Sequence, residues 1–349
     1  MIILGFCLRL IVYLIFIFTC LLLTLEFVLQ TNSDGKLLSA GSFLGGADQY
    51  AVNTEWHRKY DKRNSIGHRD REYSIKKPNN TFRILVLGDS MTFGHGIKKL
   101  EDTWHEKLET LLNQDSGPVS FEVISLSISG WNTDSQLYEL FRIGFDYSPD
   151  MILLGYYMND VPVPMFFDCK DEDIDFLPDI KVSGWLTKNS KAYDLIKFYG
   201  NRLLEELGQK DSDETCLNQR YESRGWDMEE IYLDTILMSA QIKNIHFMLS
   251  TIPVIHNLGD NYPLKKPHLK IKTYCTKKGI ECLDLYDEGF KGLVANQLRL
   301  SKTDWHLNEL GNDIIAQALF KRLKALRTYQ NLPKFSGAFN LNELLDQKP

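Results

Sequence analysis

Five short apolar runs, separated by longer segments with helical periodicity, constrain the fold of this chain more than any other feature. The runs are Arg83–Leu87, Phe121–Ser125, Met151–Gly155, Ile245–Ser250 and Ile280–Leu285. Runs of this length and composition are typical of strands buried on both faces. Because strands that alternate with helices form parallel sheets covered on both sides, we expect a three-layer α/β/α sandwich. Its sheet should be mainly parallel and five-stranded.

Two of the expected helices carry start signals. An apolar face begins at Trp104, where Thr103 and Glu106 have the spacing of a capping box. A second apolar face begins at Leu310, with Asn308 as the expected N-cap. A segment of about sixty residues at 161–224 has no comparable pattern, and we interpret it as an insertion that shapes a substrate pocket or decorates the surface.

The first apolar run ends abruptly at Gly88-Asp89-Ser90. Open α/β sheets bind and transform their ligands at the carboxyl edge, which is where this serine falls. Taken alone, Ser90 fits either an exposed, aimed hydroxyl or the capping serine of an ordinary turn. The choice between the two depends on the rest of the chain.

The other residues that a reactive serine needs are found next to other predicted strands and helices. A serine hydroxyl requires a base to take its proton, a group that orients the base, and donors for the oxyanion. The candidates are Gly130 after the second run, Asn159 after the third, and Asp304 with His306 before the last helix.

In these blocks the chain resembles the SGNH (GDSL-like) hydrolase superfamily, from about residue 83 to 326. The resemblance implies a flavodoxin-like sheet and catalysis without a metal or organic cofactor. It implies that Ser90 is the nucleophile, His306 the base and Asp304 the group that orients the imidazole. The oxyanion hole would consist of the backbone amides of Ser90 and Gly130 and the side chain of Asn159.

Two positions depart from the family pattern. Tyr157 stands where the family usually has a glycine, two residues before the asparagine. Only Trp305 separates Asp304 from His306, where the family often has two residues, and Thr303 occupies the alternative position. His95, in Gly94-His95-Gly96, is close enough in sequence to the serine to contact substrate, or it lines a pocket wall or the surface.

The N-terminus is apolar and uncharged from Leu10 to Leu25, and Arg9 precedes this run. We interpret residues 1–29 as an uncleaved membrane anchor, with a cleaved signal peptide as the alternative. Residues 30–78 then form a stalk and lead-in, in which 64–72 pack beside the main domain, residues 79–328 form that domain, and 329–349 form a tail. The positive-inside bias puts the domain on the periplasmic or extracellular side of the membrane.

Charge and cysteine usage narrow the possibilities further. A formal net charge of −6 gives no support for a nucleic-acid partner. Beyond the apolar segment the chain has Cys169, Cys216, Cys275 and Cys282. Disulfides 275–282 and 169–216 are compatible with an oxidising compartment, and buried free thiols are the alternative.

These features together predict an extracytoplasmic serine esterase that cleaves an O-acyl ester, such as an acetyl ester, through an acyl-serine intermediate. Its substrate would be an acylated glycan or a lipid. Two alternatives use the same fold: a membrane-tethered polysaccharide O-acyltransferase with the same acyl-enzyme, and a catalytically inactive binding module.

Overall fold

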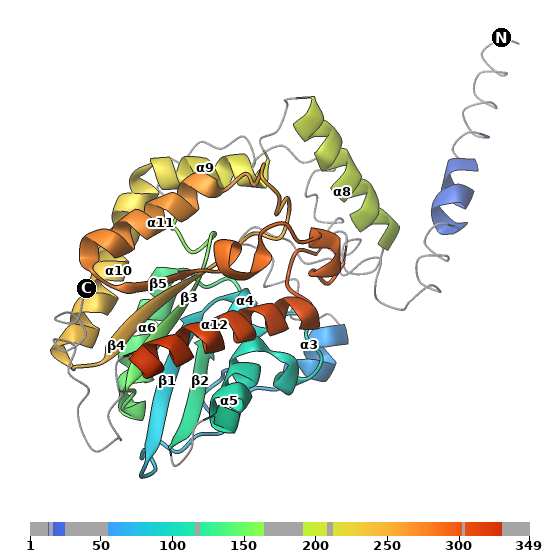
Figure 1. Cartoon of the computed structure of the whole chain (residues 1–349). Helices are drawn as coiled ribbons and strands as arrows, with labels where there is room; N and C mark the ends of the chain where they lie inside the picture. Colours follow the sequence, from blue (N-terminus) through green and yellow to red (C-terminus); the bar gives the residue numbers. More distant parts are fainter. Residues whose placement is uncertain are drawn as a thin grey trace, which may run out of the picture. The chain divides into compact units, whose positions relative to one another are not determined.

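A computed structural model describes residues 13, 17–24, 55–115, 119–163, 191–207, 212–301 and 304–329. The chain forms two compact units. One comprises Met1–Gly41, Lys170–Asp211 and Ser301–Asp304, and the other comprises Ser42–Cys169, Ser212–Leu300 and Trp305–Pro349. The larger unit contains the sheet (Figure 1). Most of the predicted anchor, the first part of the predicted stalk and nearly all of the predicted tail lie outside the described residues.

The predicted sheet is present within the described residues, with five parallel strands in the order β2-β1-β3-β4-β5. The strands are β1 (Thr81–Gly88), β2 (Ser120–Ser127), β3 (Met151–Tyr157), β4 (His246–Ile252) and β5 (Glu281–Asp284). Each strand coincides with one predicted run. The neighbouring central strands β1 and β3 are buried along their whole length, which explains why their sequences lack polar alternation.

Helices cover both faces of the sheet, as predicted. Figure 1 shows α5 (Trp104–Asp115) and α12 (Glu309–Tyr329) together in front of the sheet, and α5 packs against β2. On the opposite side, α6 (Thr133–Arg142) packs against β1 and β2 and against α10 (Arg224–Ile242). Helices lie on both faces because crossovers between parallel strands are right-handed and the chain changes direction across the sheet after β2.

The other labelled elements lie between and around these strands and helices in the sequence. They are α3 (Glu55–Tyr60), α4 (Ser90–Phe93), α8 (Lys191–Glu206), α9 (Asp213–Glu222), α11 (Lys265–Lys278), the 3₁₀ helices Leu100–Asp102, Gly144–Tyr147 and Ala295–Gln297, and the π-helical turn Tyr286–Phe290. Helices α8 and α9 lie within the predicted insertion at 161–224, which the sequence pattern had left without helices. Positions 164–190 and 208–211 of that insertion are outside the described residues.

Both predicted helix starts are confirmed, since α5 begins at Trp104 and α12 at Glu309, but only one of the two predicted caps forms. Asn308 caps α12, because its Oδ1 accepts the N–H groups of Leu310 and Gly311 at 3.0 and 3.1 Å. The predicted capping box does not form. Thr103 Oγ1 donates to the carbonyl of Leu100, and Glu106 accepts from Arg71 instead.

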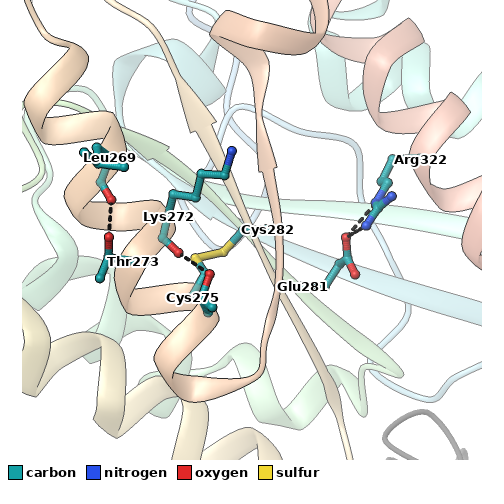
Figure 2. Close-up of a disulfide and its surroundings, with 8 residues drawn as sticks. Leu269, Lys272, Thr273, Cys275, Glu281, Cys282 and Arg322 are labelled. Carbon is teal, nitrogen blue, oxygen red and sulfur yellow. Dashed lines mark hydrogen bonds and ion pairs between the residues drawn. A yellow bond between two sulfur atoms is a disulfide. The ribbon is translucent and has the colours of Figure 1, made fainter. Parts of the chain in front are cut away.

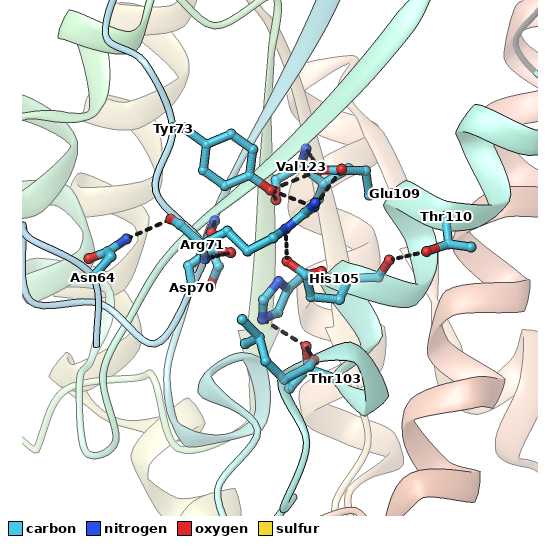
Figure 3. Close-up of polar contacts among 12 residues, drawn as sticks. Asn64, Asp70, Arg71, Tyr73, Thr103, His105, Glu109, Thr110 and Val123 are labelled. Atoms are coloured by element: carbon cyan, nitrogen blue, oxygen red, sulfur yellow. Dashed lines mark hydrogen bonds and ion pairs between the residues drawn. The ribbon is translucent and has the colours of Figure 1, made fainter. Parts of the chain in front are cut away.

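The lead-in segment is tightly bound to the sheet unit (Figure 3). Asp70 is buried and accepts the N–H of Ser125 on β2 at 2.7 Å. Arg71 pairs with two glutamates of α5, and the hydroxyl of Tyr73 donates to Glu109 at 2.9 Å. These contacts attach residues 64–73 to β2 and α5. They use polar and charged side chains that, from the sequence alone, would be expected to face solvent.

Figure 2 shows a disulfide between Cys275 on α11 and Cys282 on β5. The bridge closes the connection between the last turn of the helix and the edge strand. The adjacent Glu281 accepts from Arg322 on α12 at 2.6 Å, so this strand is held from both sides. Cys216 is also disulfide-bonded, and Cys169, which the sequence offers as its partner, lies outside the described residues.

No helix among the described residues has both the length and the apolar character that a membrane span needs.

Candidate active site

The site is built on a tight turn at the carboxyl end of β1. Asp89 follows the strand and caps α4, since its Oδ1 accepts the N–H of Met91 at 2.9 Å. Ser90 is the first residue of this short helix and is 7% exposed. The helix ends at Gly94, whose φ of 72° is in the left-handed region that favours glycine. The turn therefore presents the serine at the edge of the sheet where α/β proteins carry their chemistry.

Two glycines let this turn lie directly on the sheet. Gly88, the last residue of β1, is paired in register with Gly155, the fifth residue of β3. A Cβ at Gly88 would lie 2.1 Å from Thr92 Oγ1, and one at Gly155 would lie 2.7 Å from the same atom. Larger residues at either position would therefore push α4, and Ser90 with it, away from the strands.

The structure brings Ser90 and His306 into direct contact. His306 Nε2 lies 2.9 Å from Ser90 Oγ, a good hydrogen-bond distance across 216 positions of sequence. The histidine precedes α12, and its carbonyl accepts the N–H of Leu300 at 2.9 Å. Asn308, two residues later, caps the helix, so the backbone is held on both sides of His306. The pair has the geometry of a nucleophile and its general base.

The carboxyl group of Asp89, for which the sequence predicted no role, lies beside this pair. Ser90 Oγ is 3.4 Å from Asp89 Oδ2, and Asp89 is fully buried. Burial raises the pKa of Asp89 to about 6, against the lowering effects of the Met91 N–H and of positive charge on His306. Asp89 is therefore ionised at neutral pH and electrostatically favours the imidazolium form of His306.

Asp304, the predicted orienting group, is buried, and its N–H donates to Ser301 Oγ at 3.0 Å. It belongs to the smaller unit, together with Ser301. Its role toward His306 remains a prediction from the sequence.

The predicted oxyanion donors follow the two strands that flank β1. Gly88 at the end of β1 pairs with Ser127 at the end of β2 and with Gly155 in β3, which continues to Tyr157. Gly130 follows Ser127 by three residues, and Asn159 follows Tyr157 by two. Gly130 is exposed with a φ of 82°. The side-chain oxygen of Asn159 is buried and has no hydrogen-bond partner among the described residues. Both positions lie at the same sheet edge as Ser90, and their role as donors stays a prediction.

Two further acidic side chains, Asp160 and Glu229, are buried and bind residues close in sequence to Asn159 and Gly130. Asp160 accepts the N–H of Tyr157 at 3.1 Å, and burial raises its pKa well above the usual range, helped by the charge of Asp89. Glu229 on α10 accepts the hydroxyl of Thr133 at 2.6 Å, and burial raises its pKa to about 8. In both cases burial favours the protonated carboxyl group over the ionised one.

His95 packs against the base. Its ring centroid is 4.5 Å from that of His306 and 5.2 Å from that of Trp56 on α3. Trp56 in turn donates to the carbonyl of Ile97 at 3.1 Å. The lead-in segment thus supplies part of the aromatic cluster beside Ser90 and His306, a contribution that no local sequence signal indicated.

One buried donor cluster has a spacing that a metal could use. Ligand atoms of Asp70, His105 and Glu106 lie within 4.8 Å of one another. Protein groups already engage it, because Arg71 donates to Glu106 and Thr103 contacts His105 Nε2. Burial and two nearby arginines lower the pKa of His105 to about 3. We assign this cluster a structural role in fixing the lead-in segment.

Solved structures of similar fold are esterases and related hydrolases. They include the psychrotrophic esterase EstA from Pseudoalteromonas sp., with 16% identity, a TM-score of 0.42 and coverage of 72% of this chain and all of that one. A putative lipolytic protein of the G-D-S-L family from Desulfitobacterium hafniense has 13% identity, a TM-score of 0.39 and coverage of 68% and 98%. The acetyl xylan esterase AlAXEase has 16% identity, a TM-score of 0.39 and coverage of 69% and 100%.

No protein-family model matches the sequence, and neither does any curated protein. The likenesses to solved structures concern the fold, an α/β sandwich with a five-stranded parallel sheet in the order 2-1-3-4-5. Activity has to be inferred from the residues of this chain.

Proposed function

We propose that this chain is a serine esterase of the SGNH type that hydrolyses an O-acyl ester through an acyl-serine intermediate. The observation that carries the proposal is the 2.9 Å contact between Ser90 Oγ and His306 Nε2 at the carboxyl edge of the sheet. A buried serine that only capped a turn would need no imidazole at this distance.

The geometry supports a two-step reaction. In the first step His306 Nε2 takes the Ser90 proton while Oγ attacks the acyl carbonyl carbon, which gives a tetrahedral oxyanion. Collapse breaks the bond to the alcohol oxygen, and the proton passes from His306 to the departing alcohol. In the second step His306 deprotonates a water molecule that attacks the acyl-serine, which releases the carboxylic acid and restores Ser90.

Electrostatic support for the oxyanion is the second part of the proposal. The N–H groups of Ser90 and Gly130 and the amide of Asn159 are the proposed donors, because they follow the carboxyl ends of the adjacent strands β1, β2 and β3. Asp304 is proposed to hold the imidazole, two residues away in the chain. Negative charge on Asp89 also favours His306 once it has accepted the proton.

The proposed substrate is an ester of a short acyl group, such as an O-acetyl group on a glycan. We further propose that the uncharged run Leu10–Leu25 tethers the enzyme to a membrane, with the sheet unit outside the cytoplasm. The disulfide between Cys275 and Cys282 supports an oxidising compartment.

The test uses the full chain, purified in detergent from membranes. Wild type should react covalently with a fluorophosphonate probe and hydrolyse p-nitrophenyl acetate, and Ser90→Ala should lose both on the order of 10⁴–10⁶-fold. Ser250→Ala is the matched control, because Ser250 is a buried serine on β4, in register with Gly155. Its activity should equal that of wild type.

Three outcomes would overturn parts of the proposal. A wild-type chain that neither reacts with the probe nor hydrolyses any ester removes the esterase assignment and favours the inactive binding module. Release of the chain from membranes by alkaline carbonate removes the tether. Loss of glycan acylation in cells that carry Ser90→Ala, rather than a gain, would replace hydrolysis by acyl transfer.

A further inference from the structure

We propose that Arg69, in the lead-in segment before β1, is a positioning residue for Ser90. It acts by clamping the two peptide groups that hold the Ser90 backbone. The inference rests on the proposed function and extends it, because it assigns a role in the reaction to a residue outside the nucleophile, glycine, asparagine and histidine blocks.

The guanidinium grips the loop that follows α4. Arg69 Nη1 donates to the carbonyls of Phe93 and Gly94 at 3.1 and 3.0 Å, and Nη2 donates to that of Ile97 at 2.7 Å. Nε reaches the carbonyl of Tyr60 at 3.3 Å. The side chain is buried, so these bonds form in a region where unsatisfied polar groups are costly.

The same peptide groups bind Ser90 from their other ends. The N–H of Gly94 and the N–H of His95 both donate to the carbonyl of Ser90, at 3.1 and 3.0 Å. The first N–H shares a peptide group with the Phe93 carbonyl, and the second shares one with the Gly94 carbonyl. Arg69 therefore polarises and fixes two peptide groups that together fix the backbone of the nucleophile.

The clamp also extends toward the base. His95 contributes one of the two peptide N–H groups, and its ring packs 4.5 Å from that of His306. A displaced loop would move the serine and a wall of the imidazole site together.

The fit around the guanidinium is close. A Cβ at Gly94 would lie 3.0 Å from Arg69 Nη1 and 2.5 Å from Thr103 Cγ2. Trp56 and Phe93 present their rings to the charge at 5.2 and 5.9 Å. Burial lowers the pKa of Arg69 to about 10, so the group still carries its charge at neutral pH.

A matched residue at the other end of β1 separates positioning from general stability. Arg83 is equally buried and donates to the carbonyls of Ile75 and Tyr147 at 2.9 and 2.7 Å. It lies near the amino end of the strand, away from the Ser90 turn. Arg69→Ala and Arg83→Ala should both lower the melting temperature, but only the first should impair chemistry in the folded protein.

The experiment measures kcat and KM for p-nitrophenyl acetate and the rate of phosphonylation of Ser90 on the full chain, below the melting temperature of each variant. Arg69→Ala should lower kcat and the phosphonylation rate about 10²-fold, the effect of a misplacement of about 1 Å. KM should change less than about twofold, because the acetyl ester does not contact the clamp. Millimolar ethylguanidinium should restore part of the rate to Arg69→Ala and none to Arg83→Ala.

Arg69→Lys covers the case in which the alanine variant does not fold. It keeps the charge but cannot reach three carbonyls at once, so kcat should still fall at least about tenfold. A folded Arg69 variant with wild-type kcat and phosphonylation rate would overturn the proposal, as would an equal loss in Arg83→Ala. Failure of wild type to react at all would instead overturn the proposed function, so the two failures are distinguishable.

Discussion

Glu229 should make the stability of this protein fall as pH rises from about 4.5 to 8. The side chain is fully buried on α10 and accepts the hydroxyl of Thr133, three residues after Gly130. Burial raises its pKa from 4.5 to about 8, against the hydrogen bond from Thr133. The folded protein therefore keeps a proton that the unfolded chain releases near pH 4.5.

The sign and the size follow from linkage. Where the folded state binds more protons than the unfolded state, the free energy of unfolding decreases as pH rises. The contribution of Glu229 is fully present below about pH 4.5 and is lost as pH rises through about 8. A difference between about 8 and 4.5, at about 1.4 kcal/mol for each pH unit, amounts to about 5 kcal/mol.

Glu229→Gln isolates this effect. Glutamine keeps the shape and the oxygen that accepts from Thr133, but it does not titrate. We expect the free energy of unfolding of the variant, relative to wild type, to rise by about 5 kcal/mol between pH 4 and pH 9. Urea unfolding at a series of pH values, followed by tryptophan fluorescence with the disulfides intact, measures it.

The exposed Glu222 on α9 provides the control. Glu222→Gln should leave the difference from wild type nearly constant with pH, since its ion pair with Lys266 is at the surface. Parallel pH profiles for wild type and Glu229→Gln would refute the reasoning, because they would mean that Glu229 titrates alike in the folded and unfolded states.

Three further substitutions test the packing of Gly155 against Thr92 and the contribution of the disulfide at Cys282. Gly155→Ala should destabilise the protein by about 1–3 kcal/mol in urea unfolding, and Thr92→Ala in the same chain should recover at least about 1 kcal/mol because it removes the nearest clashing atom; no recovery would contradict the steric account. Cys282→Ser should cost about 2–3 kcal/mol for the loss of a bridge between positions seven apart, with kcat for p-nitrophenyl acetate unchanged, and a fall in kcat would show that the edge strand is coupled to the site.

The sheet was predictable from sequence because its central strands are buried on both faces. Burial at every position leaves continuous apolar runs such as that of β1, and glycine marks the carboxyl end of β1 and the fifth residue of β3. The capping box at Thr103 failed for a long-range reason. Glu106 has the correct local spacing, but Arg71, 35 positions earlier, binds its carboxylate more strongly than a helix end would.

Arg69 shows what local patterns miss. It stands in a polar stretch with many charged neighbours, where charge is typical of a solvated segment. Three of its four acceptors are carbonyls 24 to 28 positions later, and the identity of a carbonyl acceptor cannot be read from a sequence because every residue has one. The aromatic contact between His95 and His306 is equally invisible, since it depends on the packing of two loops rather than on spacing.

The pKa values of the buried acids near Ser90 differ in a way that matches where charge would develop in the proposed reaction. Asp89, beside the base, has a pKa of about 6 and is ionised at neutral pH, where it favours the imidazolium that forms on His306. Asp160 follows Asn159, and Glu229 holds the loop after Gly130, so both lie near the proposed oxyanion donors. Burial raises the pKa of both side chains and so favours their neutral forms, which do not repel a developing oxyanion. The same burial that makes stability fall with pH thus reduces negative charge beside the proposed oxyanion donors.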